Sequence, residues 1–90
     1  MLVVDKEVKE MEFFEDDVVV ITCEHPLGAD NTNVFGRIGV VIDIDKSDGE
    51  IYYDVKDTHG DDFLYAASEL RDADYEEIAE AFITLVKERI

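Results

Sequence analysis

The sequence predicts an α+β domain in which a small antiparallel β-barrel of about five strands is followed by a C-terminal amphipathic α-helix. Apolar residues alternate on both sides of a tight turn at Asp48-Gly49, which is typical of a β-hairpin. From Asp74 onward the apolar residues recur with helical spacing instead. At 90 residues the chain is expected to be one domain, with 14–72 forming the barrel and 74–90 the helix packed on it.

The first half of the predicted barrel follows a lead-in over residues 2–14, which is interpreted as a short strand or an irregular segment. Residues 18–23 are rich in β-branched side chains, which favours a strand. Residues 24–33 contain the only proline and many turn formers, which favours a loop. Residues 36–45 form the next expected strand, with alternate apolar side chains on one face. These side chains are Ile38, Val40, Ile42 and Ile44.

The second half of the predicted barrel continues the alternation after the Asp48-Gly49 turn. One face of the next strand should carry Ile51, Tyr53 and Val55, and the other face Tyr52, Asp54 and Lys56. The remaining elements expected here are a tight turn over 57–60, a short strand over 61–66 and a single helical turn over 67–70.

The C-terminal segment has the features of an amphipathic helix. Asp74 is placed to cap its N-terminus, with Glu77 at the reciprocal position of a capping box. Lys87 and Arg89 lie near the negative end of the helix dipole. One apolar stripe should be covered by the barrel and seal its open side. Its members are Tyr75, Ile78, Ala79, Phe82, Leu85 and Val86.

Charge sets this chain apart from most domains of its size. It holds 24 Asp and Glu residues against 8 Lys and Arg residues, a formal net charge of −16. The hydrophobic content of 47% still indicates a folded domain rather than a disordered acidic tail. Direct binding to nucleic acid or to an anionic membrane is disfavoured, because both require clustered Lys or Arg. The charge favours a basic protein as the partner.

The cysteine usage bears on the cellular location. Cys23 is the only cysteine, so no internal disulfide can form, which favours a reducing compartment. The start of the chain, MLVVDKEVKEMEFF, lacks the long apolar core of a signal peptide. No run approaches the ~20 apolar residues that span a bilayer. We therefore expect a cytoplasmic protein with no membrane contact.

Five segments together follow the strand pattern of a known family. They are FEDDVVVIT as an opening strand, the loop through Pro26, GRIGVVIDID as a bent second strand, EIYYDVKD as its partner, and FLYAASELR as a short fourth strand with its following turn. Through them residues 14–72 resemble the SH3-like small-barrel family, which includes KOW-type and phage-type barrels. The resemblance implies the fold alone. The chain lacks Trp and the ALYDY motif of peptide-binding members, and its loops are acidic where RNA-binding members are basic.

Several patterns were weighed as catalytic or metal sites. DIDKSDGEIYYD resembles a calcium loop, but Asp48 stands where the EF-hand glycine is required, so a hairpin turn with solvated acids is preferred. His59 lies among acids that would complete a metal site with it, and a surface turn is again preferred. Cys23 and His25 lie too close along the chain to act as nucleophile and base. We expect no enzyme activity, no catalytic residue, no cofactor and no metal.

The preferred function is a small intracellular protein-binding module, similar to accessory proteins that phages and bacteria use to redirect other proteins. One alternative is a DNA mimic that inhibits a basic nucleic-acid-binding protein, since rows of acids reproduce duplex charge. A second is a homo-oligomeric structural or regulatory subunit, although the net charge favours a monomer. Tyrosine is enriched at binding hot spots, although for Tyr52 and Tyr65 ordinary packing against the C-terminal helix is the preferred interpretation. The candidate partner-binding residues are Glu15, Asp16, Asp17, Asp43, Asp45, Tyr52, Asp61, Asp62 and Tyr65.

Overall fold

The computed structural model describes residues 12–88, with side chains described as far as Ile83. Most of the predicted lead-in over 2–14 lies outside the described residues. So do the side chains of Leu85, Val86, Lys87 and Arg89. The elements in chain order are β1 (Val18–Ile21), β2 (Ile38–Ser47), β3 (Glu50–Asp57), β4 (Asp62–Ala66), the 3-10 helix η1 (Ala67–Glu69), β5 (Leu70–Asp72) and α1 (Tyr75–Glu88).

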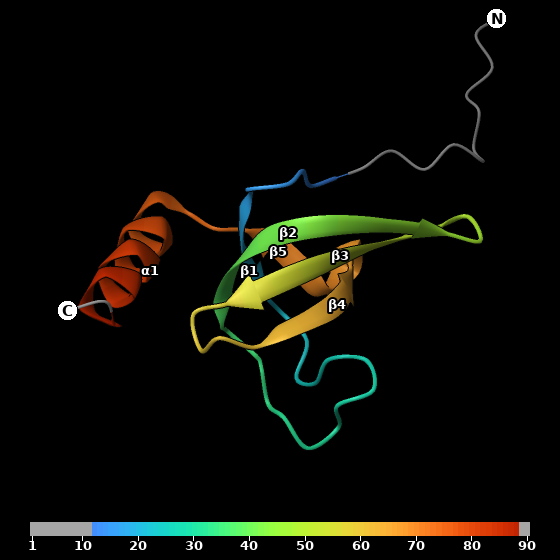
Figure 1. Cartoon of the computed structure of the whole chain (residues 1–90), viewed down its shortest axis with the longest axis horizontal. Helices are drawn as coiled ribbons and strands as arrows, with labels where there is room; N and C mark the ends of the chain where they lie inside the picture. The colour runs from blue at the N-terminus through green and yellow to red at the C-terminus, as the bar shows by residue number, and fades with distance from the viewer. Residues whose placement is uncertain (1–11, 89–90) are drawn as a thin grey trace, which may run out of the picture.

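The five strands form one antiparallel sheet in the order β4-β3-β2-β1-β5 (Figure 1). A five-stranded antiparallel sheet followed by one helix confirms the predicted α+β class. The 3-10 helix η1 carries the chain from β4, at one edge, to β5, at the other. Among the described strands no ladder pairs β4 with β5, so the sheet is open rather than closed into a barrel.

The β2–β3 hairpin forms where the alternation and the turn signal predict it. Asp48 and Gly49 both have positive φ, 53° and 78°, as the two central residues of a type I′ hairpin turn require. Glycine adopts this conformation without steric cost, and aspartate tolerates it better than most residues. The turn sets Ser47 opposite Glu50 and so fixes the hairpin register.

The hydrophobic core lies against the inward face of this sheet. Tyr53 and Val55 point inward from β3, which confirms their predicted face, and the edge of the Tyr53 ring packs on Phe13 with centroids 5.3 Å apart. The tyrosine hydroxyl also accepts the backbone N–H of Glu12 at 2.9 Å. The buried apolar residues of the cluster are Phe13, Val19, Ile21, Val34, Val41, Tyr53, Val55, Tyr65 and Leu70.

A β-bulge changes which residues of β2 face the core. The pairing with β3 shifts between Val41 and Asp43, which leaves Ile42 as an extra residue. Before the bulge Val41 faces inward, and after it Ile44 lies opposite Tyr53 and packs against the core. The prediction that Ile44 shares a face with Ile42 is therefore wrong, because one extra residue inverts the alternation.

Helix α1 begins at the predicted capping box. The Asp74 carboxylate accepts the N–H of Glu77 at 2.8 Å, and the Glu77 carboxylate accepts the N–H of Asp74 at 2.9 Å. Arg71 of β5 donates two further hydrogen bonds to Glu77, at 2.9 and 2.7 Å. This pair of contacts anchors the start of the helix to the edge of the sheet.

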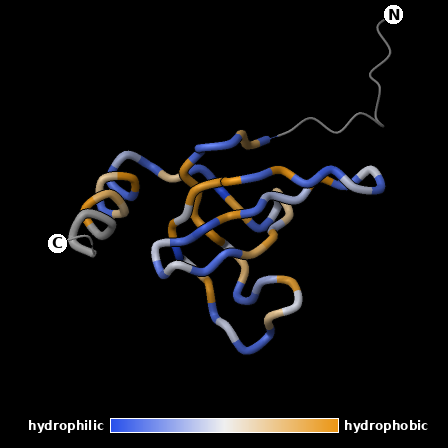
Figure 2. Tube along the Cα trace, in the orientation of Figure 1, coloured by the Kyte–Doolittle hydropathy of each residue, from blue (hydrophilic) through white to orange (hydrophobic). Residues whose placement is uncertain are grey.

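The helix does not seal the sheet as the sequence predicts. It lies beside β2 at one end of the molecule (Figures 1 and 2), and the Phe82 side chain remains 67% exposed. Ile78 and Tyr75 are exposed as well, whereas Ala81, which the predicted stripe omits, is buried. The helix touches the sheet through a small residue, so the larger apolar side chains on either side stay uncovered.

Candidate functional site

Two of the predicted acids and Tyr52 lie together on the outward face of β2, β3 and β4. The strand register places Asp43 opposite Asp54 and Asp45 opposite Tyr52. Leu64 of β4 lies opposite Asp54 on the same face. Residues directly opposite each other in antiparallel strands have Cβ atoms about 5 Å apart. We call this surface the acidic face and define it as Asp43, Asp45, Tyr52, Asp54 and Leu64.

The acidic face holds like charges in direct opposition. Asp43 is exposed, while Asp54 is half-buried with an Oδ1 atom that has no hydrogen-bond partner. Neither carboxylate forms an ion pair with a described residue. Two like charges opposite each other on neighbouring strands destabilise the pairing. A cation placed between them would remove this repulsion, so the electrostatics of the face favour a positive group.

Tyr52 joins the acidic face to a neighbouring hollow of about 470 Å³. The loop that follows β1 forms one wall, with Pro26 and the exposed Leu27, while Leu64 contributes from β4. Asp30 and Glu69 add acidic groups to the same hollow. A half-buried tyrosine between carboxylates and apolar side chains suits the aliphatic stem and charged head of Lys or Arg.

Tyr65, which the sequence predicts as a contact residue, lies in the core instead. Its side chain is 1% exposed, and burial raises the pKa of its hydroxyl group far above the usual value. The residue faces Tyr53 across the β3–β4 ladder, on the inward side of the sheet. The correction follows from the alternation: Tyr52 and Tyr65 lie on opposite faces, so one partner cannot touch both.

The predicted acids at the start of the described chain lie on the other flank of β2. The Asp16 N–H donates to the Val41 carbonyl at 2.8 Å, and the Val41 N–H donates to the Asp17 carbonyl at 3.0 Å. The Asp17 carboxylate accepts the N–H of Phe14 at 2.8 Å. Glu15 and Asp16 are exposed. These three predicted acids therefore form a second acidic patch, on the flank of β2 away from β3.

Asp61 and Asp62 are separated, although they are adjacent in sequence. The Asp61 carboxylate accepts a hydrogen bond from Arg37 at 2.7 Å, so it is already paired within the chain although its side chain is 45% exposed. Asp62 is exposed and lies opposite Lys56, on the outward face. Only Asp62 of this pair remains as a candidate for the outward surface.

Arg37, Asp57 and Asp61 form a cluster that the sequence analysis missed. The Asp57 side chain is 1% exposed and contacts Arg37 at 3.0 Å. Its other oxygen accepts the N–H groups of His59 and Asp61, at 2.8 and 3.1 Å. The hydrogen bonds that Arg37 donates to the carboxylates of Asp61 and, second, Asp57 raise the pKa of its guanidinium group. The DTHGD pattern, with an acid at each end of a tight turn, is the sequence signal for this local arrangement.

The remaining titratable candidates show no catalytic arrangement. The pKa of the Cys23 thiol is raised, first by burial and then by the Glu69 carboxylate, so the thiol stays neutral and weakly nucleophilic. His25 is tied by its Nδ1 atom to the Thr32 carbonyl at 2.8 Å. Among the described residues no group of three His, Cys, Asp or Glu side chains is arranged to hold a metal ion.

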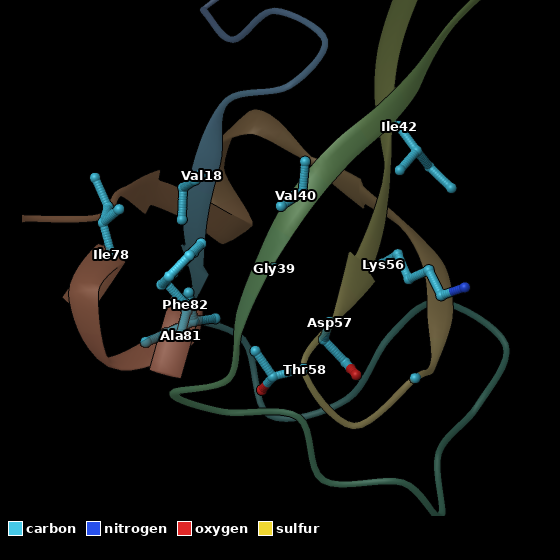
Figure 3. A pocket seen from close by; sticks show the side chains of 12 residues that line it. Val18, Gly39, Val40, Ile42, Lys56, Asp57, Thr58, Ile78, Ala81 and Phe82 are labelled. Atoms are coloured by element: carbon cyan, nitrogen blue, oxygen red, sulfur yellow. The ribbon is translucent and has the colours of Figure 1, made fainter. Parts of the chain in front are cut away.

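An apolar groove separates α1 from the outward face of β2 (Figure 3). Its volume is about 420 Å³. Ile38, Val40 and Ile42 line the sheet side, while Ile78 and Phe82 line the helix side. This groove was not predicted from the sequence, because the apolar stripe of the helix was expected to be covered by the sheet.

Comparisons with protein-family models, with curated proteins and with solved structures returned no match to this chain. Within the described residues, α1 lacks the combination of length and apolar character that crossing a membrane demands.

Proposed function

We propose that this chain is an acidic protein-binding module whose acidic face binds a Lys- or Arg-rich segment of a partner protein. The observation that carries the proposal is the opposed pair Asp43 and Asp54 beside Tyr52. No described cation neutralises this pair. A guanidinium group between the two carboxylates would form charge-assisted hydrogen bonds, and its plane would stack on the tyrosine ring.

We further propose that the domain is a variant of the SH3-like small barrel. The strand order β4-β3-β2-β1-β5 supports this assignment, as does the 3-10 helix between the two edge strands. The long loop between β1 and β2 is a third supporting feature. In this assignment the hollow beside Tyr52 lies between that loop and η1, while the acidic face covers the outward side of β2 and β3.

The overall charge would act mainly on the rate of association. A net charge of −16 attracts a basic partner from a distance, and this steering weakens with salt because the Debye length is only about 8 Å at physiological ionic strength. The contacts at Tyr52 would then determine how long the complex lasts. The two effects are separable, since salt changes the first and substitution of Tyr52 changes the second.

The experiment that tests this function is affinity capture from a bacterial lysate followed by elution with increasing salt. The immobilised full chain should retain a basic protein. The double variant Asp43→Asn with Asp45→Asn should bind the recovered protein at least about tenfold more weakly, because about 1.4 kcal/mol of lost charge interaction corresponds to one factor of ten. Tyr52→Leu, which keeps an apolar side chain but removes the ring, should mainly raise the dissociation rate.

The matched control removes the same charge elsewhere. Asp72 and Glu76 are exposed and lie away from the acidic face, so Asp72→Asn with Glu76→Gln should weaken binding far less. Equal losses for the two double variants would show a diffuse charge effect and overturn the acidic face as the site. Competition of duplex DNA with this chain for the recovered protein would favour the DNA mimic instead.

A further inference from the structure

We propose that the apolar groove between α1 and β2 receives an amphipathic helix of the partner, with Lys or Arg beside its apolar stripe. This inference rests on the proposed function, because both require a basic partner. The groove and the acidic face meet on β2, where Ile42 lines the groove and the next residue, Asp43, is an exposed acid. A single bound segment could therefore reach both surfaces.

The groove is apolar on both walls and open to solvent. Phe82 is 67% exposed and lies between α1 and β1 in Figure 3, opposite Val18 and Val40. Ile42 and Ile78 are also exposed. Contiguous exposed apolar surface of this kind, with polar residues around it, marks an interaction site in soluble domains. Covering these side chains would gain the free energy that the helix stripe fails to gain within the domain.

The backbone of β2 determines that the occupant is a helix rather than a strand. β2 is paired with β1 on one side and with β3 on the other, so it offers no free hydrogen-bonding edge beside the groove. An extended segment lying on this face would leave its own N–H and C=O groups unpaired. A helix satisfies those groups internally, so it can pack its apolar stripe against a sheet face and a neighbouring helix.

The charges around the groove favour a basic helix. Asp43 follows Ile42, and Asp62 lies opposite Lys56 on the same outward face, with both acids exposed. Among the described residues that line the groove, Lys56 is the one cation, and Asp57 is already engaged by Arg37. Lys or Arg at the edges of the incoming stripe would face these acids, whereas an acidic helix would be repelled by the net charge of −16.

The contact between Arg71 and Glu77, which anchors α1, is present before any partner binds. Arg71 holds both oxygens of Glu77, and Glu77 also accepts the N–H of Asp74. These hydrogen bonds join the first turn of α1 to the edge strand β5. A preformed groove loses less conformational entropy on binding than one that must open.

The probe for this site is a synthetic peptide of about four helical turns, with Leu at the stripe positions and Lys elsewhere. It should bind the full chain and shift the NMR signals of Ile42 and Phe82. Phe82→Ser should weaken binding about tenfold, because part of a buried aromatic contact is worth about 1.4 kcal/mol. The control Ile83→Ser changes the neighbouring exposed residue of the same helix, which does not line the groove, and should leave binding within about twofold.

A variant on the opposite wall of the groove keeps the test decisive if Phe82→Ser unfolds the helix. If circular dichroism shows that Phe82→Ser unfolds α1, Ile42→Ser tests the same groove from β2 and should also weaken peptide binding about tenfold. A matched peptide of Leu and Glu should bind far more weakly than the Leu and Lys peptide. Equal binding of the two peptides, or unchanged binding after both groove substitutions, would overturn the proposal.

Two other occupants have distinct signatures. A dimer in sedimentation that Phe82→Ser dissociates would assign the groove to a second copy and overturn the proposal. Contacts between Ile42 and residues 2–4 in the free chain would assign it to the chain's own start, with the same consequence. Failure of the proposed function is a separate outcome. In that case the double variant Asp43→Asn with Asp45→Asn would still retain the captured protein, while the peptide would still bind the groove.

Discussion

The two faces of the β2–β3 hairpin differ in what covers them. The inward face carries Val41, Tyr53 and Val55, all almost fully buried in the core. The outward face carries Ile42 and Tyr52, which remain exposed and half-buried, respectively, alongside Asp43 and other acids. Both faces come from the same two strands, so the sequence pattern alone does not distinguish a core face from a binding face.

The difference shows which face stabilises the domain by burial and which face remains open to solvent, where we propose that the partner binds. Buried apolar area stabilises the folded state, whereas like charges on the outward face cost stability. In the proposed complex, a basic partner would offset this cost. The comparison predicts large stability losses on the inward face and small or reversed effects on the outward face.

The largest contrast should come from adjacent tyrosines. Tyr53→Ala should lower the free energy of unfolding by about 3–5 kcal/mol, because it removes a buried ring and leaves a cavity. The substitution also removes the hydroxyl group that accepts the Glu12 N–H. Tyr52→Ala should cost about 1 kcal/mol or less, since its ring is only half-buried. Urea denaturation of both variants measures the contrast, and equal losses would contradict the assignment of the two faces.

Removal of the buried Asp57 carboxylate and removal of the exposed Asp43 carboxylate should change the stability in opposite directions. Asp57→Ala should cost about 2–3 kcal/mol, because it leaves Arg37 with one partner and two backbone N–H groups without their acceptor. Asp43→Ala should raise stability by a few tenths of a kcal/mol, since it relieves repulsion with Asp54. Thermal unfolding of the two variants tests the signs, and a destabilised Asp43→Ala would mean that the hydrogen bond from the Ile44 N–H to the Asp43 carboxylate, at 2.9 Å, outweighs the repulsion.

Gly39→Ala should disturb the pairing of β2 with β3, where Gly39 lies opposite Asp57. A Cβ at this position would lie 2.6 Å from the Val55 Cγ1 atom and 2.8 Å from the Lys56 carbonyl oxygen. The backbone oxygen cannot move without breaking the ladder, so we expect a loss of about 1–3 kcal/mol from overpacking. Denaturant midpoints at constant m-value would measure it, and a neutral substitution would mean that the strands separate more easily than the packing indicates.

The smallest effect concerns the pH response of the helix anchor. Hydrogen bonds from Arg71, and then from the Asp74 N–H, lower the pKa of Glu77 from 4.5 to about 2. A depressed folded-state pKa stabilises the fold above pH 4.5, and this contribution is lost as the pH falls towards 2. The NMR chemical shift of the Glu77 carboxyl carbon should titrate at this lowered pKa, and Arg71→Ala should return the pKa towards 4.5. Because the pair is exposed, global stability should change little.

Local signals in the sequence were sufficient for several elements. The Asp48-Gly49 turn and the Asp74 capping box both depend on residues within four positions of each other, so a short stretch of chain contains all the interacting groups. Strict alternation also predicted that Ile51, Tyr53 and Val55 share one face of β3. The strand β5 was not predicted separately, because three residues are too few to show a period.

The candidate site was predictable only in part. Asp43, Asp45 and Tyr52 were predicted as contact residues, and the register brings them onto one face. Tyr65 was placed wrongly, because sequence alternation gives two faces without saying which is covered. The contact between Arg37 and Asp57 was missed, since it joins positions twenty residues apart and depends on how β2 and β3 pair.

The sequence by itself determined the strands β1 to β4, the hairpin turn, the start of the helix and the strong negative charge, because these depend on neighbouring residues or on composition. Only the tertiary structure decided that the sheet stays open, that Ile42 forms a bulge and that Phe82 remains uncovered. These features depend on how distant segments pack in three dimensions. An apolar residue gains free energy from any cover, so its presence in the sequence does not specify whether that cover comes from the same chain or from a partner.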